Sequence, residues 1–459
     1  MIEITNTLTR RKEKIIPMQE GRLNMFVCGP TVYDFIHIGN ARTFVTFDVV
    51  AKYLRHRGFE VDFIQNITDI DDKIIKKANE QGRDPLELAK DFEEKFKQDM
   101  SALKVTAVNK YIPATEHINE VVSQVRKLID KGNAYLIEDD GYYFDLTTFP
   151  EYGKLSGRTT KMADDAVSRI DENDKKRNVG DFCLWKLSKL GEPSWNTEIG
   201  KGRPGWHIED TAITEKLFGP QYDIHGGGQD LIFPHHEAEI AQQESASGLK
   251  PFVKYWMHVA FLVNKENKMS KSLGNFATAH ELLEKYSPEA LRFYLLSAHY
   301  KTPLDYSGKL IDQSSAAVLR IKEAYNKLKI SDGTIDQSSA LEIAKHKFYQ
   351  SMDDNFNTSA AFASLFELIN ELNPLLITGS INKKSAEEII DFFNEVDSIL
   401  GIIPTKIDET PKEIKELIEK REKLREKESW KESDKIRTQI NDLGYTLEDT
   451  VYGPFAKKH

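Results

Sequence analysis

The segment from Asp230 to Glu239 carries two histidines and two glutamates, and three glycines, Gly226 to Gly228, stand shortly before it. His235 and Glu239 are four positions apart, so their side chains share one face of a helix. An imidazole and a carboxylate at this spacing can bind one metal ion, and Cys28, expected at the end of a strand, can reach the same crevice. The structural alternatives are a capping or surface histidine and a cysteine that is only a small core side chain. Spacing alone leaves both interpretations open.

A second segment with chemical potential runs from Gly29 to Asn40, between a predicted strand and a predicted helix. Free backbone N–H groups and the helix dipole favour anions at such a junction. His37 can donate a hydrogen bond to a phosphate, and Gly39 leaves room for a nucleotide to approach the backbone. The alternative is a surface histidine beside a packing glycine. Because the chain has no GxGxxG or Walker loop, a dinucleotide-binding or P-loop fold is not expected.

A third segment, KMSKSLGN from Lys268 to Asn275, combines small residues with two lysines. A basic loop of this kind can close over a triphosphate and stabilise its charge while pyrophosphate leaves. Lysine suits this role because its ammonium acts as a point charge. The alternative is an ordinary solvated turn of lysines and serines.

The elements that must position these residues begin with a βαβ unit. Residues 23–28 form an apolar strand, the helical spacing of apolar residues predicts a helix from Asn40 to about His56, and residues 59–65 return as a strand. Such a unit implies a parallel sheet with a right-handed crossover. The carboxyl ends of its strands are then the expected place for a ligand.

Further elements are expected along the rest of the chain. They are a helix that begins at Asp84 and Pro85, a hairpin of residues 135–137 and 142–144, and sheet segments near 222–225 and 258–263. Residues from about 130 to 195 are rich in turns and charges and are interpreted as an insertion. Beyond about residue 310 the pattern is one of amphipathic helices without a strand signal, and Gly444 is a natural helix stop.

Length and composition limit the possible classes of protein. A chain of 459 residues suggests about two to four domains. The net charge of −10 argues weakly against nucleic-acid binding, although it does not exclude a local basic face. Two distant cysteines, Cys28 and Cys183, form no disulfide framework and suit a reducing compartment. The N-terminus lacks an apolar signal region and no run approaches about 18 apolar residues, so a soluble cytoplasmic protein without a membrane partner is expected.

The order and separation of the two nucleotide-site segments resemble the paired HIGH and KMSKS signatures of class I aminoacyl-tRNA synthetases. Four further regions are similar to one family within that class, the cysteinyl-tRNA synthetases. They are Asn66 to Lys73, Gly205 to Glu209, His225 to Glu239, and the tail from Trp430 to Thr450. The resemblance extends over nearly the whole chain.

The resemblance implies an α/β fold with a doubly wound, Rossmann-like parallel sheet, followed by an all-α bundle and a small C-terminal domain. The expected organisation is a catalytic domain in two halves, 1–125 and 196–310, interrupted by a connective insertion at 126–195. A helical tRNA-binding domain at 311–400 and an anticodon-binding domain at 401–459 follow.

The resemblance also implies a zinc site, because this family holds zinc with two cysteines, one histidine and one glutamate. Cys28, His235 and Glu239 match three of these positions, whereas Asp210 stands where the family pattern has the second cysteine. Aspartate keeps the negative charge but offers a harder donor than sulfur. We therefore expect one Zn²⁺ per chain, bound less tightly than in relatives, with a site that holds no metal as the alternative.

The activity implied by the resemblance is the activation of L-cysteine with Mg²⁺ and ATP, and its transfer to tRNA(Cys). The charge on the phosphates would be stabilised by His37, Asn40 and Lys271. Many relatives have histidine at the position of Asn40, and we expect asparagine there to have only a modest effect on catalysis. A monomer is expected. The remaining predicted site residues are Gly39, Lys268 and Ser270 for ATP, and Gly29, Thr31, Thr68 and Trp206 for the amino acid.

Two other functions remain compatible with parts of the sequence. A ligase that joins cysteine to an amino sugar would need the same catalytic domain, ATP and zinc, but not the C-terminal third of this chain. A non-catalytic paralogue that binds nucleotide or RNA would not need both signature segments. The presence of the tail from Trp430 to Thr450 and of both segments favours the synthetase.

Overall fold

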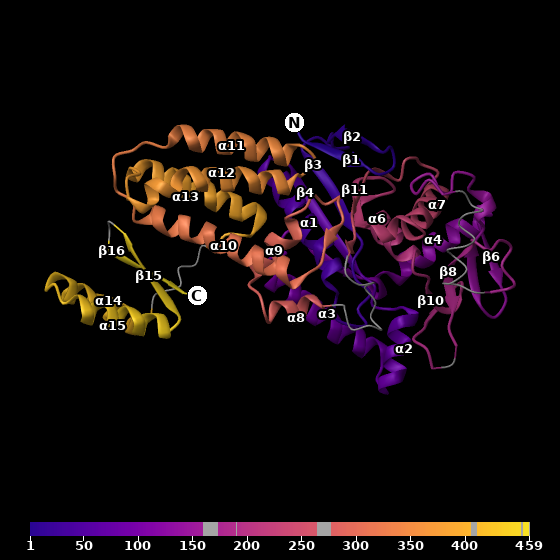
Figure 1. Cartoon of the computed structure of the whole chain (residues 1–459). Helices are drawn as coiled ribbons and strands as arrows, with labels where there is room; N and C mark the ends of the chain where they lie inside the picture. The colour runs from indigo at the N-terminus through magenta and orange to yellow at the C-terminus, as the bar shows by residue number, and fades with distance from the viewer. Residues whose placement is uncertain (159–172, 190, 264–276, 405–410, 451–452, 459) are drawn as a thin grey trace. The chain divides into compact units, whose positions relative to one another are not determined.

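A computed structural model describes residues 1–158, 173–189, 191–263, 277–404, 411–450 and 453–458. Its central feature is a five-stranded parallel sheet with the order β12-β11-β3-β4-β5 (Figure 1). The strands are β3 (Arg22–Val27), β4 (Glu60–Ile67), β5 (Lys110–Pro113), β11 (Tyr222–Gly228) and β12 (Val253–Val259). The chain runs outward from β3 through β4 to β5 and then returns to β11 on the other side of β3. The strand order therefore reverses between β3 and β11, which is where doubly wound sheets bind ligands.

Helix α1 (Ile38–His56) connects β3 to β4 and is buried along most of its length. Its first turn is capped by His37, and the chain leaves it through Gly58, whose φ of 91° suits glycine. The prediction of a βαβ unit is confirmed, with β4 reaching Ile67 rather than Gln65.

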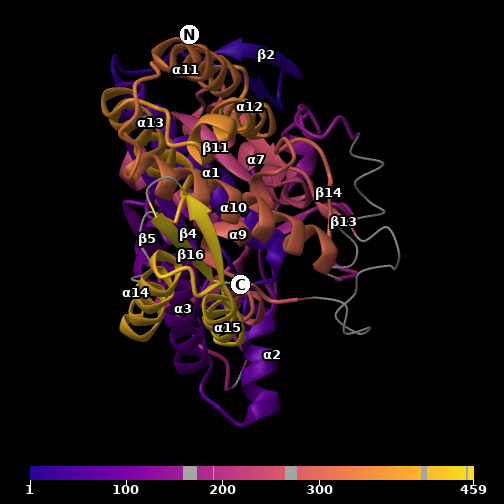
Figure 2. The ribbon, with the colours of Figure 1, turned by 60° about the vertical axis from the view of Figure 1, so that its left-hand side comes forward.

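Helices α2 (Asp72–Gln81) and α3 (Pro85–Ala102) lead from β4 to β5, and α2 protrudes beyond the sheet in both views (Figures 1 and 2). The Asp84 carboxylate accepts hydrogen bonds from the first turn of α3, as its sequence predicts. Helices α4 (Ile118–Asp130), α6 (Ile208–Phe218) and α7 (His235–Ser247) lie along the chain between β5 and β12 and pack against one another.

The insertion forms a separate antiparallel sheet with the order β6-β7-β8-β10-β9. Its strands are β6 (Ala134–Ile137), β7 (Gly141–Phe144), β8 (Phe182–Leu187), β9 (Trp195–Thr197) and β10 (Gly200–Pro204). The predicted hairpin is present as β6 and β7. This sheet continues to Pro204, past the predicted domain edge at residue 195.

Smaller elements complete this part of the chain. They are β1 (Glu3–Asn6), β2 (Arg11–Lys14), β13 (Leu262–Val263), β14 (Leu304–Asp305), α8 (Ala279–Leu283) and α9 (Pro288–Leu296). The sheet segment expected near 258–263 is two strands instead, because β12 ends at Val259 and β13 pairs with β14. Residues 1–312 and 351–359 form one compact unit, and residues 313–350 and 360–459 form a second.

The second unit is mainly helical. Its helices are α10 (Gly308–Lys329), α11 (Ser338–Asp353), α12 (Thr358–Ile377), α13 (Lys383–Leu400), α14 (Lys412–Glu426) and α15 (Trp430–Asp442), the first three extending partly into the other unit. Among the described residues, α12 alone is long and apolar enough to cross a membrane, but side chains such as Leu365 and Leu372 are buried as in an ordinary core helix.

The expectation of helices alone beyond residue 310 is wrong at the C-terminus. After α15 the chain turns at Gly444, with a φ of 83°, and forms an antiparallel hairpin of β15 (Tyr445–Thr450) and β16 (Gly453–Lys458). Leu447 of β15 packs with Ile414, Ile436 and Ile440 in a small core. The hairpin therefore completes a hydrophobic core, because it covers apolar side chains of α14 and α15.

Candidate metal centre and nucleotide crevice

A cleft of about 430 Å³ opens at the carboxyl ends of β3 and β11. It lies where the strand order reverses, as expected for a doubly wound sheet. All the predicted site residues outside the 264–276 segment except Glu239 line it: Cys28, Gly29, Thr31, His37, Gly39, Asn40, Thr68, Trp206, Asp210 and His235. Lys268, Ser270 and Lys271 lie outside the described residues.

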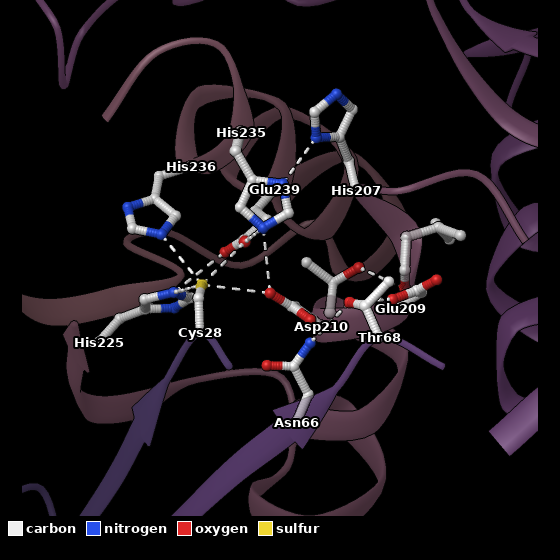
Figure 3. Close-up of polar contacts among 12 residues, drawn as sticks. Cys28, Asn66, Thr68, His207, Glu209, Asp210, His225, His235, His236 and Glu239 are labelled. Atoms are coloured by element: carbon white, nitrogen blue, oxygen red, sulfur yellow. Dashed lines mark hydrogen bonds and ion pairs between the residues drawn. The ribbon is translucent and has the colours of Figure 1, made fainter. Parts of the chain in front are cut away.

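Four predicted metal ligands meet at the floor of this cleft (Figure 3). Donor atoms of Cys28, Asp210, His235 and Glu239 all lie within 4.8 Å of one another, and all four residues are buried. The Asp210 carboxylate is 3.2 Å from Cys28 Sγ and 3.1 Å from His235 Nε2, and Glu239 Oε1 is 2.9 Å from His235 Nε2. Separations of this size suit the corners of a tetrahedron around one zinc ion.

Three elements position these four residues. Cys28 follows β3, and its N–H donates to the Gly226 carbonyl of β11 at 3.0 Å. Asp210 lies in the first turn of α6, and His235 and Glu239 lie one turn apart on α7. The arrangement thus depends on two adjacent parallel strands and two helices that pack beside their ends.

The electrostatics of the cluster suit a cation. Burial, followed by the carboxylates of Asp210 and Glu239, raises the pKa of the Cys28 thiol well above its ordinary value. Burial opposes a charged His235, but Glu239 and Asp210 outweigh it and raise the His235 pKa to about 10. Burial also raises the pKa of Glu239 to about 8 despite the opposing effect of His235. Without a metal, protons therefore occupy donor atoms that a metal would use.

One buried oxygen gives a further indication that the residues fit a metal. Asp210 Oδ1 is shielded from solvent and has no hydrogen-bond partner among the described residues. A buried carboxylate oxygen without a partner is costly, and coordination of a cation would satisfy it. The cluster is thus compatible with metal binding in its geometry, its protonation and its unsatisfied oxygen.

Sequence reasoning missed two further histidines of this centre. His225 Nε2 and His236 Nε2 lie 3.3 and 3.1 Å from Cys28 Sγ, so with Glu239 they form a second, overlapping group of four possible donors (Figure 3). Burial, followed by neighbouring histidines, lowers the pKa of both imidazoles, which keeps them neutral. The available signal was the position of His225 in a buried strand, immediately before the three glycines.

Hydrogen bonds anchor the far side of these imidazoles. His225 Nδ1 is 2.6 Å from the Tyr222 hydroxyl, and His236 Nδ1 is 2.7 Å from His258 Nε2. His235 Nδ1 is 2.8 Å from His207 Nδ1 (Figure 3). Partners of this kind fix ring orientation and leave Nε2 directed at the centre.

The wall beside the metal centre comes from Trp206 and the loops after β3 and β4. The Trp206 ring stacks on His235 with a centroid separation of 4.4 Å. Thr68 pairs with Thr31 as an isolated bridge, and its hydroxyl donates to Glu209 at 2.8 Å. At Gly29 a Cβ would meet the Asn66 carbonyl oxygen at 1.7 Å, so only glycine allows the chain after β3 to approach the end of β4 this closely.

The nucleotide end of the cleft is built around His37. This residue is the N-cap of α1, and its Nδ1 accepts a hydrogen bond from the Asn40 N–H at 3.2 Å. Because Nδ1 accepts, the proton of the neutral ring belongs on Nε2, which can then donate. A Cβ at Gly39 would lie 2.8 Å from His37 Nδ1, so this glycine also makes room for the capping ring.

Backbone hydrogen bonds join this junction to the residues after the KMSKS segment. The Ile38 N–H donates to the Ala277 carbonyl at 3.2 Å, and the Ala279 N–H donates to the Ile36 carbonyl at 3.0 Å. The residues that follow the segment Lys268–Asn275 are therefore hydrogen-bonded directly to residues 36–38, at the start of α1.

Comparisons with known proteins identify the family. Residues 14–316 match the tRNA synthetases class I (C) catalytic domain, and residues 347–404 match the DALR domain. The chain is 44% identical over 463 residues to a cysteine–tRNA ligase of Caldicellulosiruptor saccharolyticus, covering 98% of each protein. It is also 44% identical over 475 residues to one of Thermococcus gammatolerans, covering 100% of this chain and 99% of the relative.

Solved structures of other synthetases share the fold. Methionyl-tRNA synthetase of Mycobacterium tuberculosis in complex with methionyl-adenylate aligns with a TM-score of 0.61 at 16% identity, over 77% of this chain and 83% of that one. The ternary complex of Agrobacterium radiobacter LeuRS, tRNA and LeuAMS aligns with a TM-score of 0.59 at 11% identity, over 84% and 85%. At these identities the likeness concerns the fold.

Proposed function

Because this chain belongs to the cysteine–tRNA ligase family of class I synthetases, we propose that it activates L-cysteine with Mg²⁺ and ATP and then esterifies tRNA(Cys). The supporting observation is the buried cluster of Cys28, Asp210, His235 and Glu239 at the floor of the cleft. Three of its four members line the cleft, so the centre is accessible to a small substrate.

The cluster would hold Zn²⁺, which would supply a thiophilic centre able to add the substrate sulfur to the four protein donors. Cysteine and serine differ only by sulfur versus oxygen, and pocket shape discriminates between such similar side chains by only about 10- to 200-fold. A thiolate is a much better ligand than a hydroxyl for a borderline-soft metal. Cys28, Asp210, His235 and Glu239 would thus determine amino-acid choice, while Trp206 holds His235 in place by stacking on it.

In the first step the cysteine carboxylate attacks the α-phosphate of ATP, and pyrophosphate leaves. The Nε2–H of His37 and the side chain of Asn40 would donate to the phosphates, with Lys271 neutralising the triphosphate. His37 is well suited because its hydrogen bond with the Asn40 N–H fixes both ring orientation and tautomer. Preorganised donors of this kind lower the barrier without a covalent protein intermediate.

In the second step a terminal ribose hydroxyl of the tRNA attacks the adenylate carbonyl, and AMP leaves. The helical second unit and the tail would bind the tRNA, and Trp430, which is 57% exposed at the start of α15, is available for stacking on a base. The match to full-length relatives supports RNA rather than an amino sugar as acceptor. We also propose a monomer that acts in the cytoplasm.

Two assays test this function. Cysteine-dependent exchange of pyrophosphate into ATP measures the first step, and charging of a tRNA(Cys) transcript measures the second. We expect both activities with cysteine and neither with serine at equal concentration. Exchange without charging would support the amino-sugar ligase, and absence of exchange would support a non-catalytic binding protein.

A further inference from the structure

The first turn of α2 carries a lysine, Lys73, that the functions argued above do not use. Its side chain lines the cleft together with Tyr33, Thr68 and Trp206. Of the described residues that line this cleft, Lys73 is the one lysine or arginine. A cleft that must accept the carboxylate of an amino acid therefore contains a single candidate ammonium group to pair with it.

The carboxylates nearest to Lys73 in the sequence already have other partners. Asp71 is the N-cap of α2, and its Oδ1 accepts a hydrogen bond from the backbone N–H of Lys73 at 2.9 Å. Asp72 pairs with Lys186 and Arg203. Across the part of the chain that the structure describes, Lys73 Nζ makes no hydrogen bond or ion pair. Its charge and its donors are therefore available to a ligand.

Two aromatic rings hold the ammonium group of Lys73 without neutralising it. Nζ lies 5.9 Å from the centroid of the Tyr33 ring and 5.9 Å from that of the Trp206 ring. Cation–π contacts at such distances attract a cation but leave its net charge unchanged. Because they also restrict a flexible side chain before a ligand arrives, less entropy is lost when an anion binds.

The location of Lys73 indicates which anion it would bind. The Trp206 ring that contacts Lys73 also stacks on His235 with a centroid separation of 4.4 Å, so a single ring separates the ammonium group from the proposed metal centre. The nucleotide end of the cleft is built around His37 instead. A cysteine whose sulfur lies on the metal has two remaining charged groups, and a cation attracts only the carboxylate.

We propose that Lys73 binds the α-carboxylate of the cysteine substrate. The inference rests on the proposed aminoacylation function and deepens it, because it gives the amino acid a second point of attachment besides its sulfur. In the activation step a carboxylate oxygen forms a bond to the α-phosphorus, and the bond from that phosphorus to the bridging oxygen breaks, so that pyrophosphate leaves with the electron pair.

The carboxylate loses its negative charge as this bond forms, so the attraction to Lys73 is strongest before the reaction. An interaction of this kind lowers KM without raising kcat. Lys73 is thus expected to hold the substrate and orient its carboxylate toward ATP. Its removal should raise KM for cysteine and should not lower kcat.

The test compares three small thiols on the full-length, zinc-loaded protein by isothermal titration calorimetry. L-Cysteine carries both charged groups, 3-mercaptopropionate has only the carboxylate, and cysteamine has only the ammonium group. For Lys73→Gln we expect Kd to rise by about fivefold with the two carboxylates, as for one partly exposed charge pair, and to stay within about twofold with cysteamine. Lys73→Arg keeps the charge and should recover at least part of the loss.

Lys76→Gln is the matched control. Lys76 is an exposed lysine of the same helix and lines neither the cleft nor the neighbouring cavity, so this variant should bind all three thiols as wild type does. In cysteine-dependent exchange of pyrophosphate, we expect Lys73→Gln to raise KM for cysteine by about fivefold and to leave KM for ATP within about twofold of wild type.

Three results would overturn the proposal. An equal rise in Kd for all three thiols would indicate that Lys73 only shapes the pocket. An unchanged Kd for L-cysteine would show that the carboxylate has another partner. A rise in KM for ATP as large as the rise for cysteine would place the ammonium group on the phosphates. Failure of the proposed function is distinguishable, since wild-type protein would then show no cysteine-dependent exchange, whatever its affinity for the thiols.

Discussion

The carboxylate of Asp210 lies 3.1 Å from Nε2 of His235, at the floor of a cleft and out of contact with bulk water. The same oxygen, Oδ2, is 3.2 Å from Cys28 Sγ, whereas Oδ1 has no hydrogen-bond partner among the residues that are described. Asp210 thus lies among the proposed metal ligands, with an oxygen where the resemblance to the family predicts sulfur. This substitution makes the metal centre the most informative place to test the protein.

Replacing Asp210 with cysteine is expected to strengthen zinc binding. A thiolate is a softer donor than a carboxylate, so the zinc dissociation constant should fall by about tenfold or more, roughly 1.4 kcal/mol. Competition with a chromophoric chelator measures this constant. Asp210→Asn is the control, because it keeps the shape but removes the charge, and it should weaken binding. If both variants bind zinc as the wild type does, Asp210 is not a ligand.

Zinc uptake by the metal-free protein is expected to weaken as the pH falls. The Cys28 thiol has a raised pKa, and the pKa values of His235 and Glu239 are raised to about 10 and about 8, so all three retain protons near neutral pH. Zinc must displace these protons, and raising the pH from about 7 to 9 lessens the competition, chiefly at Glu239, and increases affinity. Each displaced proton contributes about a tenfold change in affinity per pH unit. A pH indicator should therefore report proton release when zinc is added to the metal-free protein. If no protons are released, the donors are already deprotonated and the prediction is wrong.

Much of this centre could be predicted because its signals are local. The spacing of His235 and Glu239 alone places them on one helical face, and Cys28 follows an apolar strand that proved to be β3. Asp210 was placed there only by family resemblance, because no local pattern links α6 to the end of β3. His225 and His236 were missed for the same reason: their approach to Cys28 depends on how α7 packs beside β11.

The C-terminal hairpin shows a different limit of sequence reasoning. Residues 445–450 alternate only weakly, and their partner strand, residues 453–458, contains two lysines and a proline. Neither segment has the apolar alternation that marks a strand, so only the pairing with each other and the packing of Leu447 on α14 and α15 stabilise them. The hairpin thus forms because of tertiary contacts, and a pattern of residue propensities along the sequence does not contain such contacts.

Trp206→Ala is expected to raise KM for cysteine more than KM for ATP. The indole stacks on His235 at a centroid distance of 4.4 Å, and loss of such a contact costs about 0.5–1.5 kcal/mol, a change of roughly two- to thirteenfold. Trp206→Phe should recover part of the effect, and Trp430→Phe, a change of an exposed residue in the other compact unit, is the control. Exchange kinetics with each substrate varied in turn separate the two constants. An equal rise in both would contradict a specific role in the amino-acid pocket.

His37→Ala is expected to reduce cysteine-dependent exchange by about 10²- to 10³-fold, the usual loss when one preorganised donor to a developing charge is removed. The same change removes the N-cap of α1, which costs about 1 kcal/mol of stability and would confuse the interpretation. His37→Asn separates the two effects, because asparagine is a good N-cap but cannot place a donor where Nε2 lies.

We therefore expect His37→Asn to unfold at the same temperature as wild type. Its kcat, by contrast, should fall as far as that of His37→Ala. Asn40→His, which introduces the residue common among relatives, should change exchange by no more than about threefold, because either side chain can donate to a phosphate. Differential scanning calorimetry and pyrophosphate exchange on the three variants give both quantities. If His37→Asn keeps wild-type kcat, the imidazole serves only to cap α1, and the donor to the phosphates must be sought elsewhere in the cleft.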